Sequence, residues 1–131
     1  MATLPGVIWS FDISPDGSII AFATSKGLEL YDLQTFAHLR TLDANQNVYS
    51  LAWSPDGKEL AVGLLAETPD PTEFSGGKAI LKIWETSAWK IVLEPDLADS
   101  LLSERILDIA WKPNGTALAL STDMHGVMVV D

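Results

Sequence analysis

Residues 48–57 read Val-Tyr-Ser-Leu-Ala-Trp-Ser-Pro-Asp-Gly, a segment rich in β-branched and aromatic residues that runs directly into a turn sequence. Such residues, followed by the alternating apolar run 60–64, are typical of half-buried β-strands. Pro-Asp-Gly supplies the fixed φ of proline and the positive φ that glycine adopts readily, as a tight turn requires. This stretch therefore predicts a strand, a turn and a returning strand.

The same pattern occurs three times in the chain. Residues 7–17 read Val-Ile-Trp-Ser-Phe-Asp-Ile-Ser-Pro-Asp-Gly, and residues 106–115 read Ile-Leu-Asp-Ile-Ala-Trp-Lys-Pro-Asn-Gly. Pro15 and Pro55 are 40 positions apart, whereas Pro55 and Pro113 are 58 apart, so the second unit carries about 18 extra residues. A period of this length indicates a repeat architecture. The chain is thus predicted to be all-β, with one antiparallel meander in each unit.

Within each unit the strands are named A to D in chain order. The predicted ranges are 7–13, 48–53 and 106–111 for strand A; 19–24, 59–64 and 117–122 for B; 27–32, 79–84 and 126–130 for C; and 36–42 and 88–94 for D.

These features resemble the WD-repeat family of β-propellers. The resemblance rests on Ser-Pro-Asp-Gly after strand A, on Tyr31-Asp32 and Trp84-Glu85 at the end of strand C, and on the spacing near 40. It covers nearly the whole chain and implies antiparallel four-stranded β-meander blades, one per repeat. The implied blades are about 7–47, about 48–105 with insertions at 65–78 and 94–105, and about 106–131, the last without its final strand.

The sequence also departs from the family pattern. No Gly-His pair precedes any strand A, and the third unit ends in Val-Val-Asp where the family would have Trp-Asp. Similar Ser-Pro-Asp-Gly turns occur in TolB-like propellers, so the subfamily stays open. Recurrence at one register position indicates packing, so Trp53 and Trp111, and likewise Tyr31 and Trp84, are predicted to lie in the cores between blades.

Three blades alone leave two apolar sheet faces uncovered, because a closed propeller has typically 4 to 8 blades. Three interpretations follow. The chain is a fragment of a longer propeller, or identical chains assemble into a ring of six or nine blades, or the three blades form an open wedge.

Composition and charge exclude some classes of binding partner. The 131 residues include 8 Lys or Arg and 18 Asp or Glu, giving a net charge of −10, and no Cys. This balance argues against nucleic acid and anionic membranes as partners. Neither a signal peptide nor a membrane-spanning run is visible, so the cytoplasm is the default location.

Catalytic and metal-binding patterns find little support in the sequence. The two histidines, His38 and His125, belong to different units and nonequivalent positions, and neither has a ligand-spaced partner. We therefore expect no enzyme activity, no cofactor and no metal site.

Both insertions of the second unit fall on the face that carries the D-to-A and B-to-C loops, since strands run up and down in order. Long loops on a rigid scaffold often carry recognition. The insertions are acidic and would attract a basic partner protein. Alternatively, their charges merely keep the loops solvated. The candidate binding residues are Glu67, Asp70, Glu73, Phe74, Asp96 and Asp99, joined by Asn47 and Tyr49 at the start of strand A, where the family often contacts partners.

The sequence thus favours a non-catalytic protein-protein interaction scaffold that binds through this face. The alternative is a structural part of a larger propeller-containing enzyme or sensor, whose active residues lie outside this chain. The blades that complete the propeller would come either from a second copy of this chain or from the rest of a longer chain.

Overall fold

The computed structural model describes residues 4, 6–66, 78–95, 105–123 and 126–131. Within this part the chain forms three antiparallel sheets and no helix. The first sheet contains β1 (Ile8–Ile13), β2 (Ile19–Thr24), β3 (Gly27–Asp32) and β4 (His38–Leu42). The second contains β5 (Asn47–Trp53), β6 (Glu59–Ala66), β7 (Lys78–Glu85) and β8 (Lys90–Leu93). The third contains β9 (Ile106–Trp111), β10 (Leu118–Thr122) and β11 (Gly126–Val130).

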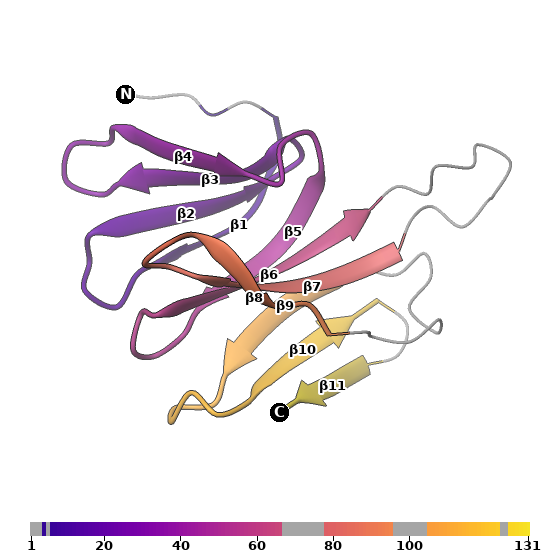
Figure 1. Ribbon diagram of the computed structural model, residues 1–131. Helices are drawn as coiled ribbons and strands as arrows, with labels where there is room; N and C mark the ends of the chain where they lie inside the picture. Colours follow the sequence, from indigo (N-terminus) through magenta and orange to yellow (C-terminus); the bar gives the residue numbers. More distant parts are fainter. Residues whose placement is uncertain (1–3, 5, 67–77, 96–104, 124–125) are drawn as a thin grey trace, which may run out of the picture.

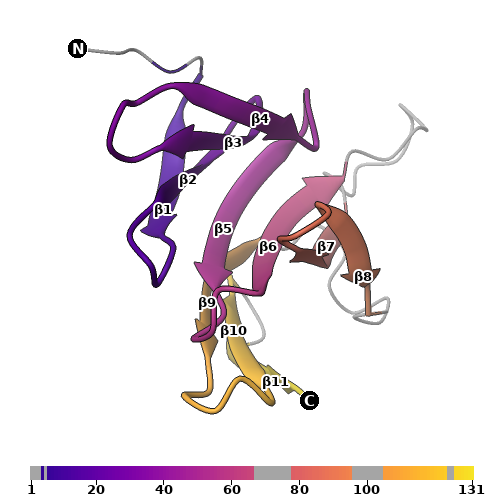
Figure 2. The ribbon, with the colours of Figure 1, turned by 60° about the vertical axis from the view of Figure 1, so that its left-hand side comes forward.

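Each sheet is a meander in which neighbours along the chain pair with one another (Figure 1). The order is β1-β2-β3-β4 in the first sheet, β5-β6-β7-β8 in the second, and β9-β10-β11 in the third. The sheets fan out around their first strands, with β5 between β1 and β9 (Figure 2). The expected all-β fold of antiparallel propeller blades is therefore confirmed, and we call the three sheets the first, second and third blade.

The turns between the first two strands of each blade follow from their sequence. Gly17, Gly57 and Gly115 all have positive φ, between 73° and 77°. In the first turn, the Asp16 Oδ1 accepts hydrogen bonds from the Ser14 and Ser18 hydroxyls, both at 2.7 Å. Such local bonds fix a turn without help from the rest of the fold. They hold the pKa of the Asp16 carboxyl at about 2, below its ordinary 3.8.

Two apolar cores lie between the blades. One side of each core consists of small and aliphatic residues from β2, β3 and β4, or from β5, β6 and β7, and the other side comes from the first two strands of the following blade. The core between the first and second blades contains Ala21, Ala23, Leu28, Leu30, Leu42, Val48, Leu51, Trp53, Leu60, Val62 and Leu64. The core between the second and third blades contains Ala52, Ala61, Ala79, Leu81, Ile83, Ile106, Ile109, Leu118 and Leu120.

Polar contacts tie the first strands of successive blades together. The Trp53 indole N–H donates to the Asp12 carbonyl at 3.3 Å, and the Trp111 indole N–H donates to the Ala52 carbonyl at 2.9 Å. Between the second and third blades, the Ser50 hydroxyl donates to the Ile106 carbonyl at 2.8 Å. These bonds join residues about one blade apart in sequence and fix how neighbouring blades align.

The aromatic residues follow the expected packing with one correction. Trp53 is buried in the first core, and Trp84 and Trp111 pack partly buried against the first and second cores. Tyr31 belongs to neither core. It lies on the opposite face of the first blade, stacked on Phe36 with ring centroids 5.0 Å apart. Its register matches that of Trp84, but no described blade covers this face.

Candidate functional site

The structure describes two of the eight predicted binding residues. Glu67, Asp70, Glu73, Phe74, Asp96 and Asp99 lie outside the described residues. Asn47 and Tyr49 lie in β5, near the end where this strand begins, and both are partly buried. The geometry below therefore concerns Tyr49 and the side chains around it.

Four side chains meet where the first strands of the blades, β1, β5 and β9, begin. We call them the Tyr49 cluster: Trp9, Tyr49, Arg105 and Asp123. The Trp9 and Tyr49 rings are tilted against each other with centroids 5.2 Å apart. The Arg105 guanidinium lies over the Tyr49 ring, 5.6 Å from its centroid, a distance at which cation–π attraction operates. The cluster thus joins all three blades, because Trp9 lies in β1, Tyr49 in β5, and Arg105 and Asp123 flank the strands β9 and β10.

An ion pair orients the arginine. The Arg105 Nε donates to Asp123 Oδ2 at 2.9 Å, Nη2 lies 2.7 Å from the same oxygen, and the Arg105 backbone N–H donates to Asp123 Oδ1 at 2.8 Å. Partial burial works to raise the pKa of Asp123, but the hydrogen bonds and charge of Arg105 outweigh it and hold that pKa below its usual value. The same hydrogen bonds raise the pKa of Arg105. The ring of Tyr49 is therefore covered by a guanidinium in a fixed orientation.

Local backbone geometry explains how Trp9 and Tyr49 come together. The pairing of β1 with β2 shifts between Ile8 and Ser10, and the pairing of β5 with β6 shifts between Val48 and Ser50. A bulge re-aims the extra side chain relative to the alternating pattern. Trp9 and Tyr49 are those residues, at the same position of their blades. Trp9 remains 46% exposed.

Sequence reasoning identified Tyr49 but missed Trp9, Arg105 and Asp123. Trp9 shares the register position of Tyr49, and that equivalence is the signal that could have identified it. Arg105 and Asp123 carry no such signal, because their pairing depends on how the third blade is placed against the second.

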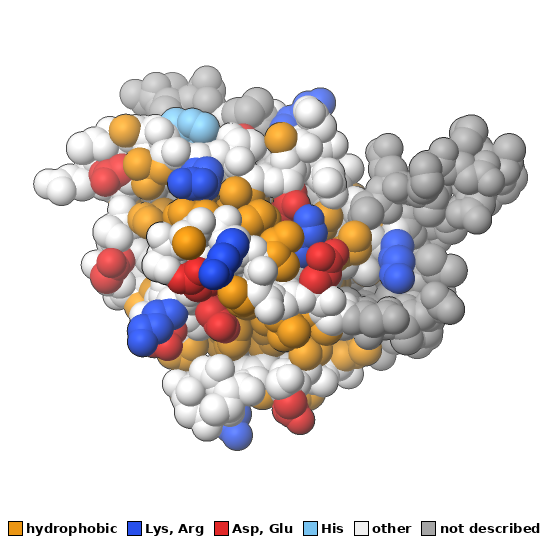
Figure 3. Space-filling view, in the orientation of Figure 1, with side chains coloured by type: hydrophobic (Ala, Val, Ile, Leu, Met, Phe, Trp, Pro, Cys, Tyr) orange, Lys and Arg blue, Asp and Glu red, His pale blue; other side chains and the backbone are white. Residues whose placement is uncertain are grey.

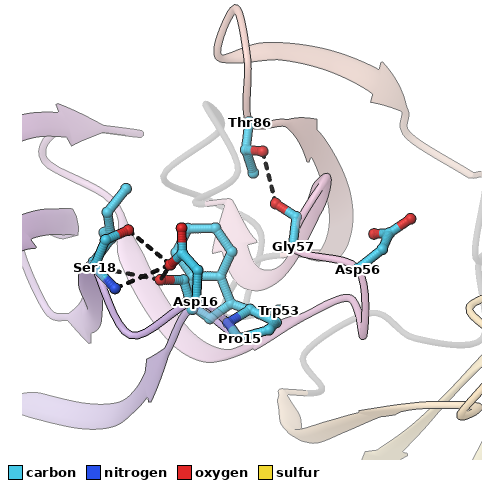
Figure 4. A pocket seen from close by; sticks show the side chains of 9 residues that line it. Pro15, Asp16, Ser18, Trp53, Asp56, Gly57 and Thr86 are labelled. Carbon is cyan, nitrogen blue, oxygen red and sulfur yellow. Dashed lines mark hydrogen bonds between the residues drawn. The ribbon is translucent and has the colours of Figure 1, made fainter.

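A small hollow lies at the opposite end of the blades, between the first and second turns (Figure 4). It measures about 160 Å³, below the roughly 300 Å³ at which ligand pockets begin. Asp16 and Asp56 lie on its rim, and their oxygens accept hydrogen bonds within their own turns. Among the described residues, no group of three or more His, Asp or Glu side chains could hold a metal ion.

On the side of the molecule seen in Figure 3, the described Lys, Arg, Asp and Glu side chains are interspersed over an apolar surface. The described part of the chain also contains no helix of the length and hydropathy that a membrane span requires.

Comparison with known proteins agrees with the architecture. Residues 36–85 match the family model described as WD domain, G-beta repeat. The chain is 28% identical over 127 residues to the WD repeat-containing protein VIP3 of Arabidopsis thaliana, a match that covers 88% of this chain and 36% of that protein. It is 25% identical over 91 residues to eukaryotic translation initiation factor 3 subunit I of Phaeosphaeria nodorum, which covers 60% of this chain and 27% of that protein.

The matched segment extends from the approach to β4 to the end of β7, so it crosses from the first blade to the second. Three successive blades with interblade cores define a β-propeller segment. The match to the family model and to VIP3 supports the resemblance of this chain to the WD-repeat family, whose members generally serve as protein-interaction scaffolds. It spans about a third of the length of the curated relatives it matches.

Proposed function

We propose that this protein is a non-catalytic interaction scaffold that binds a protein partner through the face carrying the D-to-A and B-to-C loops. The observation that supports it is the Tyr49 cluster on this face. Trp, Tyr and Arg are the residues most enriched in the energetically dominant centres of interfaces. Here Trp9 and Tyr49 lie in strands of two blades and Asp123 orients Arg105, so less conformational entropy would be lost when a partner covers them.

The acidic loop residues extend this proposal. Glu67, Asp70, Glu73, Asp96 and Asp99, which the sequence assigns to loops of this face, would favour a partner with a basic patch, while Phe74 would add an apolar anchor. Asn47 precedes Tyr49 by two residues in β5 and would contribute a hydrogen-bonding amide.

Trp9→Ala combined with Tyr49→Ala tests the proposed face. Quantitative affinity capture from an extract of the source organism should lose a defined set of partners by about tenfold or more, since truncating dominant interface residues costs about 2 kcal/mol or more. Lys112→Ala with Asn114→Ala is the matched control, because these exposed residues belong to a turn at the opposite end of the blades. Equal capture by both double variants, with unchanged melting temperatures, would contradict the proposal.

A variant of the acidic loop separates charge from the aromatic anchor. Replacing Glu67 and Glu73 with Gln and Asp70 with Asn should weaken capture at low salt and leave it nearly unchanged at high salt, because salt screens exposed charges. Phe74→Ala should weaken capture at both salt concentrations. If the charge variant loses the same share of captured partner at every salt concentration, the idea of a basic patch on the partner is refuted.

A second candidate is a structural part of a larger propeller-containing enzyme or sensor. The length of the relatives favours it, because this chain spans only 36% and 27% of them. Sequencing the transcript beyond codon 131 distinguishes the two: a downstream catalytic or sensor domain in the same reading frame would favour the second candidate.

A further inference from the structure

The bulges in the first strands release one large side chain in each blade. Trp9 and Tyr49 are two of these, and the pairing of β9 with β10 skips Leu107 in the same way, between Ile106 and Asp108. These three side chains lie outside both interblade cores, and Trp9 and Leu107 are 46% and 48% exposed. We propose that the Trp9 ring is the docking point for an arginine side chain of the partner. This inference rests on the proposed function, because it names the group that the partner presents to the Tyr49 cluster.

The Tyr49 ring shows how an aromatic side chain of this row holds a cation. The Arg105 guanidinium lies 5.6 Å from the centroid of the Tyr49 ring, and its ion pair with Asp123 fixes its orientation. Tyr49 stands six positions before Pro55, and Arg105 stands eight positions before Pro113. The cation therefore comes from the first residues of the following blade.

Trp9 has no such cation at the corresponding position of its own chain. Trp9 stands six positions before Pro15, and the residue eight positions before Pro55 is Asn47. Asparagine is neutral, so Asn47 cannot supply the charge that Arg105 supplies to Tyr49. Indole is nevertheless a better cation acceptor than the phenol ring of tyrosine. The better acceptor of the two rings is thus the one that its own chain does not pair with an arginine.

The surroundings of Trp9 suit a flat cationic group. The Tyr49 ring lies against Trp9, with centroids 5.2 Å apart and ring planes 43° apart, and supports the indole from one side. Trp9 nevertheless stays exposed, so a partner side chain can reach it. Guanidinium is planar and more weakly hydrated than ammonium, and it stacks on aromatic rings. These properties favour arginine over lysine as the docking group.

Charge also favours a cationic side chain. The sequence carries a net charge of −10, which attracts cations to the protein. Within the Tyr49 cluster, the charge of Arg105 is compensated by Asp123, whose Oδ2 lies 2.7 Å from Nη2. Lys26 is exposed in the turn between β2 and β3 at the same end of the blades, and its single charge opposes this attraction. The acidic excess of the chain is larger than this one ammonium.

A double-mutant cycle between the protein and a peptide tests the contact. The probe is the capped pentapeptide Lys-Gly-Arg-Gly-Lys, and its variant carries citrulline, the neutral isostere of arginine, at the central position. Ligand-observed NMR titration of the full chain at low salt gives the dissociation constant of each peptide for the parent protein and for Trp9→Leu. Leucine keeps an apolar side chain at this position but has no aromatic ring.

The expected result is a coupling between the Trp9 ring and the arginine charge. Citrulline should weaken binding to the parent protein about two- to fivefold more than it weakens binding to Trp9→Leu, as expected for a cation–π contact at an exposed site. Trp9→Phe keeps a ring and should retain part of this coupling. Phe11→Leu is the matched control, because Phe11 is an exposed aromatic residue of the same strand. This variant should respond to citrulline as the parent protein does.

Three results would overturn the inference. The first is an equal loss of affinity on citrulline substitution in the parent protein and in Trp9→Leu, which would mean that only long-range charge attracts the peptide. The second is a coupling to Phe11 as large as the coupling to Trp9. The third is the absence of peptide binding at millimolar concentration. Melting temperatures of the variants establish that each is folded.

The capture experiment with Trp9→Ala and Tyr49→Ala distinguishes failure of this inference from failure of the proposed function. If that double variant loses its partners while the peptide cycle shows no coupling, the face binds partners without an arginine at Trp9, and only the inference fails. If the cycle shows coupling while the double variant captures every partner, the proposed function fails, and with it the assignment of the arginine to a partner.

Discussion

Gly63 is the residue whose substitution the structure constrains most tightly. A Cβ at this position would lie 2.5 Å from Ser50 Oγ and 2.8 Å from Ile106 Cβ, so glycine permits the close approach of the second and third blades. Gly63→Ala should lower the free energy of unfolding by about 1–3 kcal/mol, the usual cost of overpacking. Chemical denaturation measures this change. Ser121→Ala, at the same position of the third blade, should change stability by less than about 0.5 kcal/mol.

Asp16 tests whether the turn hydrogen bonds form in solution. With its pKa lowered to about 2 by hydrogen bonds from Ser14 and Ser18, the carboxylate contributes stability above its unfolded pKa near 4. That contribution is lost as the pH falls from about 4 to about 2. NMR titration should place the Asp16 midpoint near pH 2, and Ser14→Ala should raise it. A midpoint near 4 in the parent chain would show that these bonds do not persist.

At the scale of elements, β7 is connected to the corner between β4 and β5 by a buried ion pair. Lys82 Nζ donates to Asp43 Oδ1, and the second oxygen of Asp43 is buried without a described hydrogen-bond partner. Lys82→Met should destabilise the protein by about 3–5 kcal/mol, because it leaves a buried carboxylate without its cation. Methionine is a suitable replacement because Met128 occupies the same position in the third blade.

Changing both partners provides the control for this ion pair. Lys82→Met combined with Asp43→Asn removes the buried charge, and asparagine tolerates the positive φ of 49° at this corner. The double variant should recover most of the stability that the single variant loses in urea denaturation. If Lys82→Met alone is as stable as the parent chain, the ion pair does not form as described.

The strands were largely predictable because their signals are local. Alternating apolar residues and the Pro-Asp-Gly turns specify where β1, β2, β5 and β6 begin and end, within two residues. The contacts of Tyr49 with Arg105 and of Lys82 with Asp43 were not predictable, since they join segments far apart in sequence. These contacts depend on the strand bulges and on the alignment of neighbouring blades, and no local sequence pattern predicts either.

At the scale of the whole molecule, the second blade alone has a described blade on each side. Its inner strand β5 and its neighbour β6 contribute residues to both cores. Each blade contacts only its neighbours, as in other repeat proteins, so local stability depends on the number of covered faces. The backbone amides of β6 should therefore exchange with deuterium more slowly than those of β2 and β10. Equal exchange in the three strands would show that the blades unfold as one unit.

The approach at Gly63 also sets the spacing between two blades. A side chain at this position would push against Ile106, so the second and third blades would separate or tilt. Because each blade of a repeat protein contacts only its neighbours, the third blade would carry such a tilt with it, and the curvature of the stack of blades would change.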